Sequence, residues 1–175
     1  GTFRDENDDI HVVAESREVV YTPPVASGLE TWMRQLCEFA NDFDGFFVHP
    51  VVRAIILHFM LSYIHPYVDG NGRTARALFY WSMLRDGYWL VEFVSISRIL
   101  RSAPAKYGRA FLYAETDEND LTYFIVHQLD VVRRSISELQ HYIQTRVSGL
   151  EEVEKQLRNS DLTHELNHRQ LALLR

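Results

Sequence analysis

The sequence of 175 residues contains a single cysteine, Cys37, so it cannot form an intramolecular disulfide. Chains without disulfides are typical of reducing compartments, and we expect a cytoplasmic location. No signal peptide opens the sequence, and the longest apolar run, residues 54–64, is too short to span a bilayer. These absences argue against a disulfide-stapled secreted domain and against an integral membrane protein, and we expect no membrane partner.

The chain also lacks an excess of basic residues, because its net charge is −6. An acidic protein is a poor general binder of nucleic acid, so we expect no nucleic acid partner for this chain. Any anionic ligand must instead be held by a local group of cations and amides. The hydrophobic content of 46% and the charged content of 24% are ordinary for a globular domain with a buried core.

The spacing of apolar residues predicts a mainly α fold. Pro50 suits the first turn of a helix, and Pro66 disfavours a helical His65, so that helix should end at His65. Residues 10–21 contain two short β-prone runs, which are typical of a small β-hairpin. Helical spacing of apolar residues, or a capping signal, marks residues 27–41, 50–63, 73–86 and 104–114, and again from Asp120 onward.

A narrow apolar stripe runs through the otherwise polar residues 132–157. Such a stripe favours packing on another helix, in the same chain or in a homodimer. Gly149 interrupts the segment, so one bent helix and two separate helices both fit the pattern. We divide the chain into a domain over residues 1–145 and a C-terminal helical extension over residues 146–175.

The stretch "IHPYVDGNGRTAR", residues 64–76, concentrates special-purpose residues. Gly70 and Gly72 permit a positive φ and stand before a helix whose first amides have no intrahelical partner. Such amides favour phosphate or another anion. Arg73 and Arg76 follow on one face of the helix, and guanidinium groups suit phosphate oxygens. The stretch therefore predicts a cradle for a di- or triphosphate.

The remaining polar residues of this stretch predict a reaction on that phosphate. A carboxylate beside phosphates needs a cation between them, so Asp69 is the expected ligand of Mg²⁺. Asn71 can donate its amide where negative charge develops, and His65 can accept a proton from an attacking hydroxyl. Each part alone is common, because a glycine-rich helix start is also typical of a turn and Arg76 could also be a structural partner of Asp69 or of another acid. The ordered combination favours chemistry on a magnesium-bound nucleotide.

"HPYVDGNGRTAR" resembles the signature of Fic-domain proteins (Fic/DOC superfamily), His-Pro-Phe-x-Asp/Glu-Gly-Asn-Gly/Lys-Arg-x-x-Arg. Tyr67 departs from it, since phenylalanine is usual there. "GTFR" at the start, "YTPP" at 21–24 and "DLTYFIVHQL" at 120–129 also resemble segments of such proteins, so the resemblance covers most of residues 1–145. The end of the chain, "NHRQLALL", resembles the first helix of a winged-helix domain, and we expect a truncated region of that kind.

The resemblance implies a helical core with a β-hairpin flap, near residues 10–21, that positions the target. It implies a protein adenylyltransferase that moves AMP from Mg-ATP to a Ser, Thr or Tyr hydroxyl of a target protein, with self-modification compatible. The implied catalytic residues are His65, as the general base, Asn71 and Arg73, and Asp69 would be the magnesium ligand. The implied nucleotide-binding residues are Gly70, Asn71, Gly72, Arg73 and Arg76, and Tyr107 falls near the expected base pocket.

The sequence is also compatible with other functions. The same motif is compatible with transfer of UMP, phosphocholine or phosphate, and a second hypothesis is a regulatory nucleotide-binding module attached to a DNA-binding domain. Residues 2–7 formally match the family's inhibitory motif, but they align better with the "GTFR" segment, so Glu6 is not expected to inhibit. Any inhibitory helix would lie upstream. His58 is expected to be a hydrogen-bonded core histidine.

Overall fold

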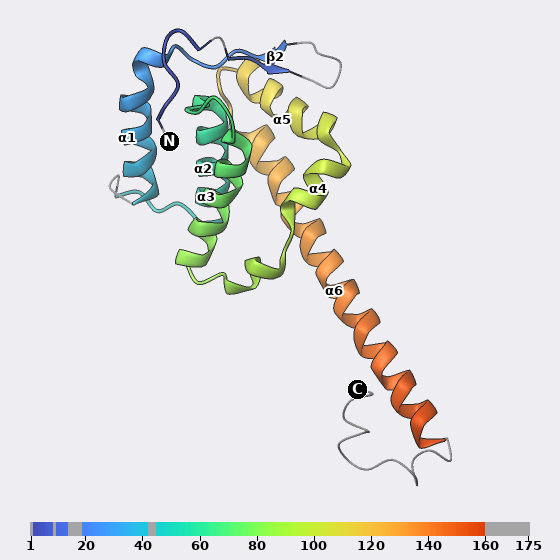
Figure 1. The fold of residues 1–175 in the computed structure, drawn as a ribbon. Coiled ribbons are helices and arrows are strands. Elements are labelled where there is room, and N and C mark those ends of the chain that lie inside the picture. The colour runs from blue at the N-terminus through green and yellow to red at the C-terminus, as the bar shows by residue number, and fades with distance from the viewer. Residues whose placement is uncertain (1, 9, 14–18, 42–44, 160–175) are drawn as a thin grey trace. The chain divides into compact units, whose positions relative to one another are not determined.

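The computed structural model describes residues 2–8, 10–13, 19–41 and 45–159 (Figure 1). Most of these residues are helical, as the sequence predicts. The chain divides into two compact units, Gly1–Arg133 and Arg134–Arg175, and the residues of the site described below lie in the first. The domain boundary at residue 145 stays a prediction, and the expected winged-helix segment lies outside the described residues.

The first three long helices carry the site. They are α1 (Leu29–Ala40), preceded by the short 3-10 helix η1 (Ala26–Gly28), α2 (Pro50–Ile64) and α3 (Asn71–Arg85). Pro50 occupies the first turn of α2, and the side chain of His49 caps that turn by accepting from the Val51 amide at 3.3 Å. The helix ends at Ile64, so the predicted stop at His65 is confirmed.

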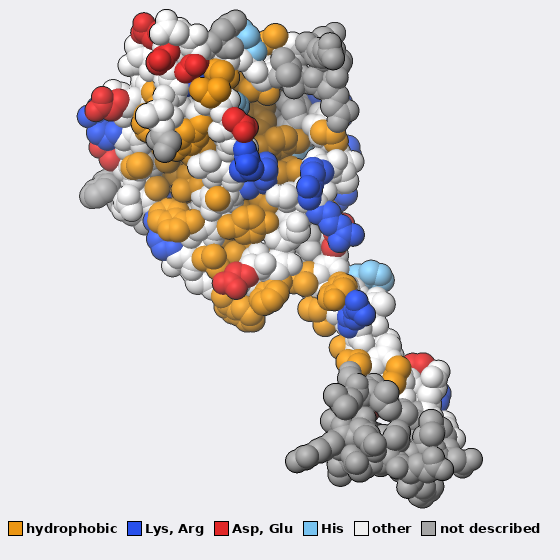
Figure 2. All heavy atoms as spheres, viewed as in Figure 1, with side chains coloured by type: hydrophobic (Ala, Val, Ile, Leu, Met, Phe, Trp, Pro, Cys, Tyr) orange, Lys and Arg blue, Asp and Glu red, His pale blue; other side chains and the backbone are white. Residues whose placement is uncertain are grey.

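The rest of the chain adds η2 (Trp89–Phe93), α4 (Ile96–Ser102), α5 (Pro104–Thr116) and α6 (Thr122–Arg158). Asp120 caps α6 as predicted, because its carboxylate accepts from the Thr122 amide at 2.9 Å. The helix runs through Gly149 without a break, which settles the choice between one helix and two. Apolar side chains gather over η2, where Trp89 is 63% exposed (Figure 2).

Two short strands precede α1. The strands β1 (Val12–Val13) and β2 (Val19–Tyr21) pair antiparallel, with Val12 opposite Tyr21 and an irregular register beside it. The residues that connect them lie outside the described part of the chain. The Tyr21 hydroxyl donates to the Tyr63 carbonyl at 2.8 Å, which fastens β2 to the last turn of α2. That the β1–β2 ribbon acts as a flap that positions the target stays a prediction.

The helix α2 is buried on nearly every side. An aliphatic cluster joins it to α1 and α3, with Leu57, Leu61 and Ile64 packed among Leu29, Leu36, Ala40 and Ala75. An aromatic cluster joins it to α5 and the start of α6. The Phe59 and Phe111 rings stack with their centroids 5.2 Å apart, and the Phe111 and Phe124 ring centroids are 4.5 Å apart. Each buried aromatic ring contributes on the order of 3 kcal/mol to stability. This packing fixes the C-terminal end of α2, where the candidate site begins.

Candidate functional site

The motif loop connects α2 to α3, and its two ends have left-handed backbone. His65 ends α2 with φ of 51°, and Gly70 precedes α3 with φ of 90°. No side chain caps α3, and the first amide bonded within it is that of Thr74, which donates to the Gly70 carbonyl at 2.9 Å. The amides of residues 71–73 are therefore left without a partner in the helix, at the positive end of its dipole. This arrangement suits an anion.

A pocket of about 290 Å³ opens at this helix start. It brings together every site residue that the sequence predicts except Tyr107. Its lining residues are His65, Val68, Asp69, Gly70, Asn71, Gly72, Arg73 and Arg76.

His65 is half-buried at the wall of this pocket. Its Nδ1 lies 3.2 Å from the Ser62 carbonyl, and because a carbonyl only accepts, Nδ1 must carry the proton. The Nε2 lone pair is then left for another proton. Burial lowers the pKa of His65, the hydrogen bond to Ser62 partly opposes this, and the charge of Arg4 lowers the pKa further. The ring is thus held neutral near pH 7, as a general base must be.

Asp69 and Arg73 form an ion pair at the rim. Their side chains meet at 2.8 Å and are 88% and 73% exposed, respectively, so the pair contributes little to stability and can open to a ligand. The other Asp69 oxygen accepts from the Gly70 amide at 2.6 Å. Arg76, by contrast, has no hydrogen bond or ion pair among the described residues, so its reading as a structural partner of Asp69 is wrong. Gly72 leaves room for it, since a Cβ there would lie 3.2 Å from Arg76 Nη1.

The single carboxylate of Asp69 fits magnesium only in company with a substrate. The described residues contain no group of three or more His, Cys, Asp or Glu side chains that could hold a metal ion. Magnesium is often bound by one or two carboxylates together with substrate phosphates. An exposed carboxylate beside the unpaired amides of residues 71–73 matches that pattern.

Asn71 holds the loop together. The residue is only 3% exposed, and its side chain donates to the Tyr67 carbonyl at 2.6 Å and accepts from the Tyr67 amide at 2.9 Å. The predicted donation from this side chain to a phosphate stays a prediction, and its remaining N–H is the one that would serve. The Tyr67 ring, which replaces the usual phenylalanine, lies 5.8 Å from the Phe3 ring.

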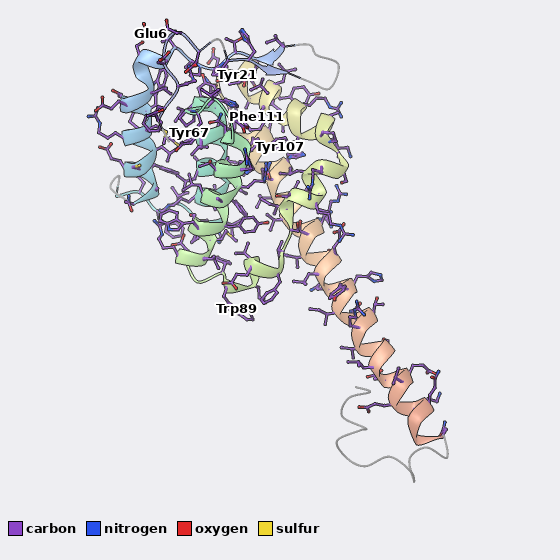
Figure 3. The ribbon with its side chains drawn as sticks, viewed as in Figure 1. Glu6, Tyr21, Tyr67, Trp89, Tyr107 and Phe111 are labelled. Carbon is purple, nitrogen blue, oxygen red and sulfur yellow. The ribbon has the colours of Figure 1, made fainter. Side chains whose placement is uncertain are left out.

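Tyr107 lies in the aromatic core and not in the pocket lining (Figure 3). Its hydroxyl is 3.0 Å from His58 Nε2, and burial raises the pKa of Tyr107 to about 12. His58 is fully buried, so the expectation of a hydrogen-bonded core histidine is confirmed. Contact between Tyr107 and a nucleotide base stays a prediction.

The sequence did not predict the contact between Arg4 and the motif loop. This buried side chain donates to the His65 carbonyl at 2.8 Å, although it is 61 residues away in the chain. Arg4 is the last residue of the "GTFR" segment, which resembles a segment of Fic proteins but does not by itself indicate a contact with His65. Nearby Glu6 is exposed and lies in a turn, so it is not part of an inhibitory helix (Figure 3).

No helix in the described part of the chain is both long and apolar enough to cross a membrane. A model of the Fic/DOC family matches residues 1–83. The chain is 38% identical over 68 residues to the protein adenylyltransferase Fic of Nematostella vectensis, a match that covers 39% of this chain and 16% of that protein. The protein of the same name from Aedes aegypti is also 38% identical over 68 residues, again 39% of this chain and 14% of the relative.

The fold agrees with these matches. The crystal structure of a Fic family protein from Desulfovibrio desulfuricans aligns with a TM-score of 0.61 and 25% identity, over 72% of this chain and 36% of that one. The chain spans only a small part of the curated relatives that it matches. Sequence, fold and motif geometry agree, and this chain carries a domain of the Fic/DOC family, matched over residues 1–83.

Proposed function

We propose that this chain is a protein adenylyltransferase, which transfers AMP from ATP to a Ser, Thr or Tyr hydroxyl of a target protein. The observation that carries the proposal is the meeting, in one pocket, of unpaired amides at residues 71–73, the cation of Arg76 and the neutral ring of His65. An anion cradle with a base at its wall suits attack on a phosphate. The names of the relatives support the same reaction.

The reaction is an in-line displacement at the α-phosphorus. The target hydroxyl oxygen attacks, and its proton passes to Nε2 of His65. The new oxygen–phosphorus bond forms as the bond to the bridging oxygen breaks, and pyrophosphate leaves. The amides of residues 71–73 stabilise the charge that develops on the phosphate oxygens, and Arg73 and Arg76 hold the remaining phosphates.

Asp69 would hold Mg²⁺, with the phosphates completing its coordination. When bound, the ion screens the phosphate charge. Arg73 would exchange Asp69 for phosphate oxygens, which costs little because their ion pair is exposed.

Further parts of the proposal concern partners. The β1–β2 ribbon, fastened to α2 through Tyr21, would align the target segment near His65. Self-modification and a homodimer through the apolar stripe of α6 belong to the same proposal, as does a cytoplasmic location. Among the stripe residues, Ile143 and Val147 are about half exposed.

The test uses ATP labelled at the α-phosphate, with γ-labelled ATP in parallel. The purified chain is incubated with Mg²⁺ and cell lysate, and self-modification is followed by intact mass. We expect α-label on protein, lost in His65→Ala and on chelation of Mg²⁺, and retained in the matched control His141→Ala, whose side chain is exposed on α6.

Other labelling results would indicate a different reaction or a different function. Label from the γ-phosphate would indicate phosphate transfer, and label only from other donors would indicate UMP or phosphocholine transfer. Tight ATP binding without any transfer would contradict the proposal and favour a regulatory nucleotide-binding module attached to a DNA-binding domain.

A further inference from the structure

The C-terminal end of α2 has its carbonyls satisfied from outside the helix. An α-helix leaves its last carbonyls without intrahelical partners. Here the Tyr63 carbonyl accepts from the Tyr21 hydroxyl at 2.8 Å, and the Ile64 and His65 carbonyls accept from Arg4 at 3.3 and 2.8 Å. The Ser62 carbonyl accepts from the His65 ring itself. The helix end is therefore capped by side chains that come from the N-terminal segment and β2.

Arg4 makes two of these four contacts. It is 7% exposed, its guanidinium also donates to the Pro24 carbonyl, and its own amide donates to the Pro66 carbonyl at 2.8 Å. No carboxylate in the described part of the chain pairs with it. Its charge lies instead at the negative end of the α2 dipole, which stabilises a cation there. Arg4 thus links the N-terminal segment, the segment between β2 and η1, and the start of the motif loop.

We propose that Arg4 is a positioning residue for the general base, and that it holds His65 in its left-handed conformation at the wall of the pocket. A non-glycine residue adopts positive φ at a cost that surrounding contacts must offset. Arg4 supplies these contacts, because it bonds the carbonyls on both sides of the His65 α-carbon, those of Ile64 and His65. The catalytic part of this inference rests on the proposed function, but the placement of His65 does not.

The charge of Arg4 acts in the same direction as its hydrogen bonds. Burial is the main cause of the lowered pKa of His65, and the Arg4 cation lowers it further. The other ionisable groups that line the pocket are Asp69 and Arg73, which pair with each other, and Arg76. Arg4 is the only one of these charges that is bonded to the backbone of His65 itself.

The test compares Arg4→Gln, which removes the charge, with Arg4→Lys, which keeps the charge but loses the guanidinium group that donates to several carbonyls at once. The matched control is Arg85→Gln, because Arg85 also donates to a helix-end carbonyl, that of Ala40, away from the pocket. NMR titration of the His65 ring, identified by its absence in His65→Gln, gives the pKa. Backbone chemical shifts of His65 report its φ, and MgATP affinity shows whether the phosphate-binding groups at the start of α3 are intact.

We expect the His65 pKa to rise in Arg4→Gln and to stay near the parent value in Arg4→Lys. In both variants the His65 backbone shifts should move away from positive φ, and kcat for AMP transfer should fall by on the order of 10²-fold, since small misplacements of a reacting group have effects of that size. MgATP affinity should change by less than about twofold, because Arg4 does not line the pocket. The control should leave all of these readouts at parent values.

Unchanged His65 shifts and pKa in Arg4→Gln would overturn the inference, whether or not AMP transfer occurs. Equal losses of kcat and MgATP affinity would also overturn it, since Arg4 would then support the fold in general. If the parent chain transfers no AMP but His65 responds as expected, the positioning role stands and only the proposed function is lost.

Discussion

His58 lies within α2 and His65 directly follows its last residue, and burial is the main cause of the lowered pKa of both. His58 is fully buried, its Nε2 is satisfied by the Tyr107 hydroxyl, and burial lowers its pKa to about 3. His65 is half-buried, and its Nε2 is left for a ligand at the wall of a pocket. A perturbed pKa therefore does not identify a catalytic group by itself. Access of the lone pair to a cavity makes the distinction.

The largest expected effect separates these two residues by activity. His65→Ala should lower AMP transfer by roughly 10²- to 10⁴-fold, the usual contribution of a general base, with MgATP affinity little changed. His58→Leu should retain transfer at a temperature where the variant is folded. Rates from the α-labelled assay, normalised to the folded fraction by circular dichroism, give the comparison. Equal losses in both variants would show that the two histidines do not differ in role.

The sequence predicted the pocket well because its parts are local. Residues 65–76 are contiguous, and proline, glycine and arginine have conformational and chemical preferences that do not depend on distant contacts. The long helices α1, α2, α3, α5 and α6 were predictable for the same reason, whereas the short helices η2 and α4 were not predicted. Arg4 and Tyr21 were not, since their partners lie 61 and 42 residues away and no periodic pattern records such contacts. The place of Tyr107 in the core, against His58, likewise depends on how α5 packs on α2.

The second prediction concerns acid stability. The pKa of His58 in the folded chain is about 3, below its ordinary value of 6.5, so the unfolded chain binds the proton first as the pH falls. Stability from His58 is complete above about pH 6.5 and is lost toward pH 3, at up to about 1.4 kcal/mol per pH unit. Urea unfolding between pH 4 and 7 should show this slope, less steep in His58→Leu.

His58→Leu also lowers the free energy of unfolding by an amount that does not depend on pH, so this loss does not alter the pH dependence of stability. It leaves the Tyr107 hydroxyl without its partner, a loss of about 1–3 kcal/mol at all pH values. His141→Leu is the control, because it makes the same substitution at an exposed position on α6. A slope equal in the parent and in His58→Leu would show that the buried ring is not the group that titrates.

The third prediction tests whether Tyr107 belongs to the core or to the nucleotide site. Tyr107→Phe removes the hydroxyl that bonds His58 and should lower the free energy of unfolding by about 1–2 kcal/mol. The resemblance to Fic proteins predicts weaker ATP binding instead, whereas the packing predicts an MgATP affinity within about twofold of the parent. We expect the second result, measured by calorimetry. Weaker binding with unchanged stability would place Tyr107 in the nucleotide site.

The smallest expected effect comes from Arg76, which links the two regions. Its charge contributes to the lowered pKa of His58, while its side chain lines the pocket with His65. Gly72→Ala should press on this side chain, since the added Cβ would lie 3.2 Å from Arg76 Nη1. MgATP affinity should fall by roughly threefold to tenfold, about 0.7–1.4 kcal/mol, as the guanidinium shifts from the phosphates.

Gly108→Ala in α5 is the matched control, because a Cβ there meets nothing within 4 Å. It should leave MgATP affinity unchanged and raise stability by about 0.5–1 kcal/mol, the usual gain for alanine inside a helix. The acid slope assigned to His58 should be the same in Gly72→Ala as in the parent, since burial is its main cause and a small shift of Arg76 leaves that burial intact. A weaker slope together with weaker ATP binding would mean that Arg76 couples the core to the pocket, so that the two histidines respond to one charge.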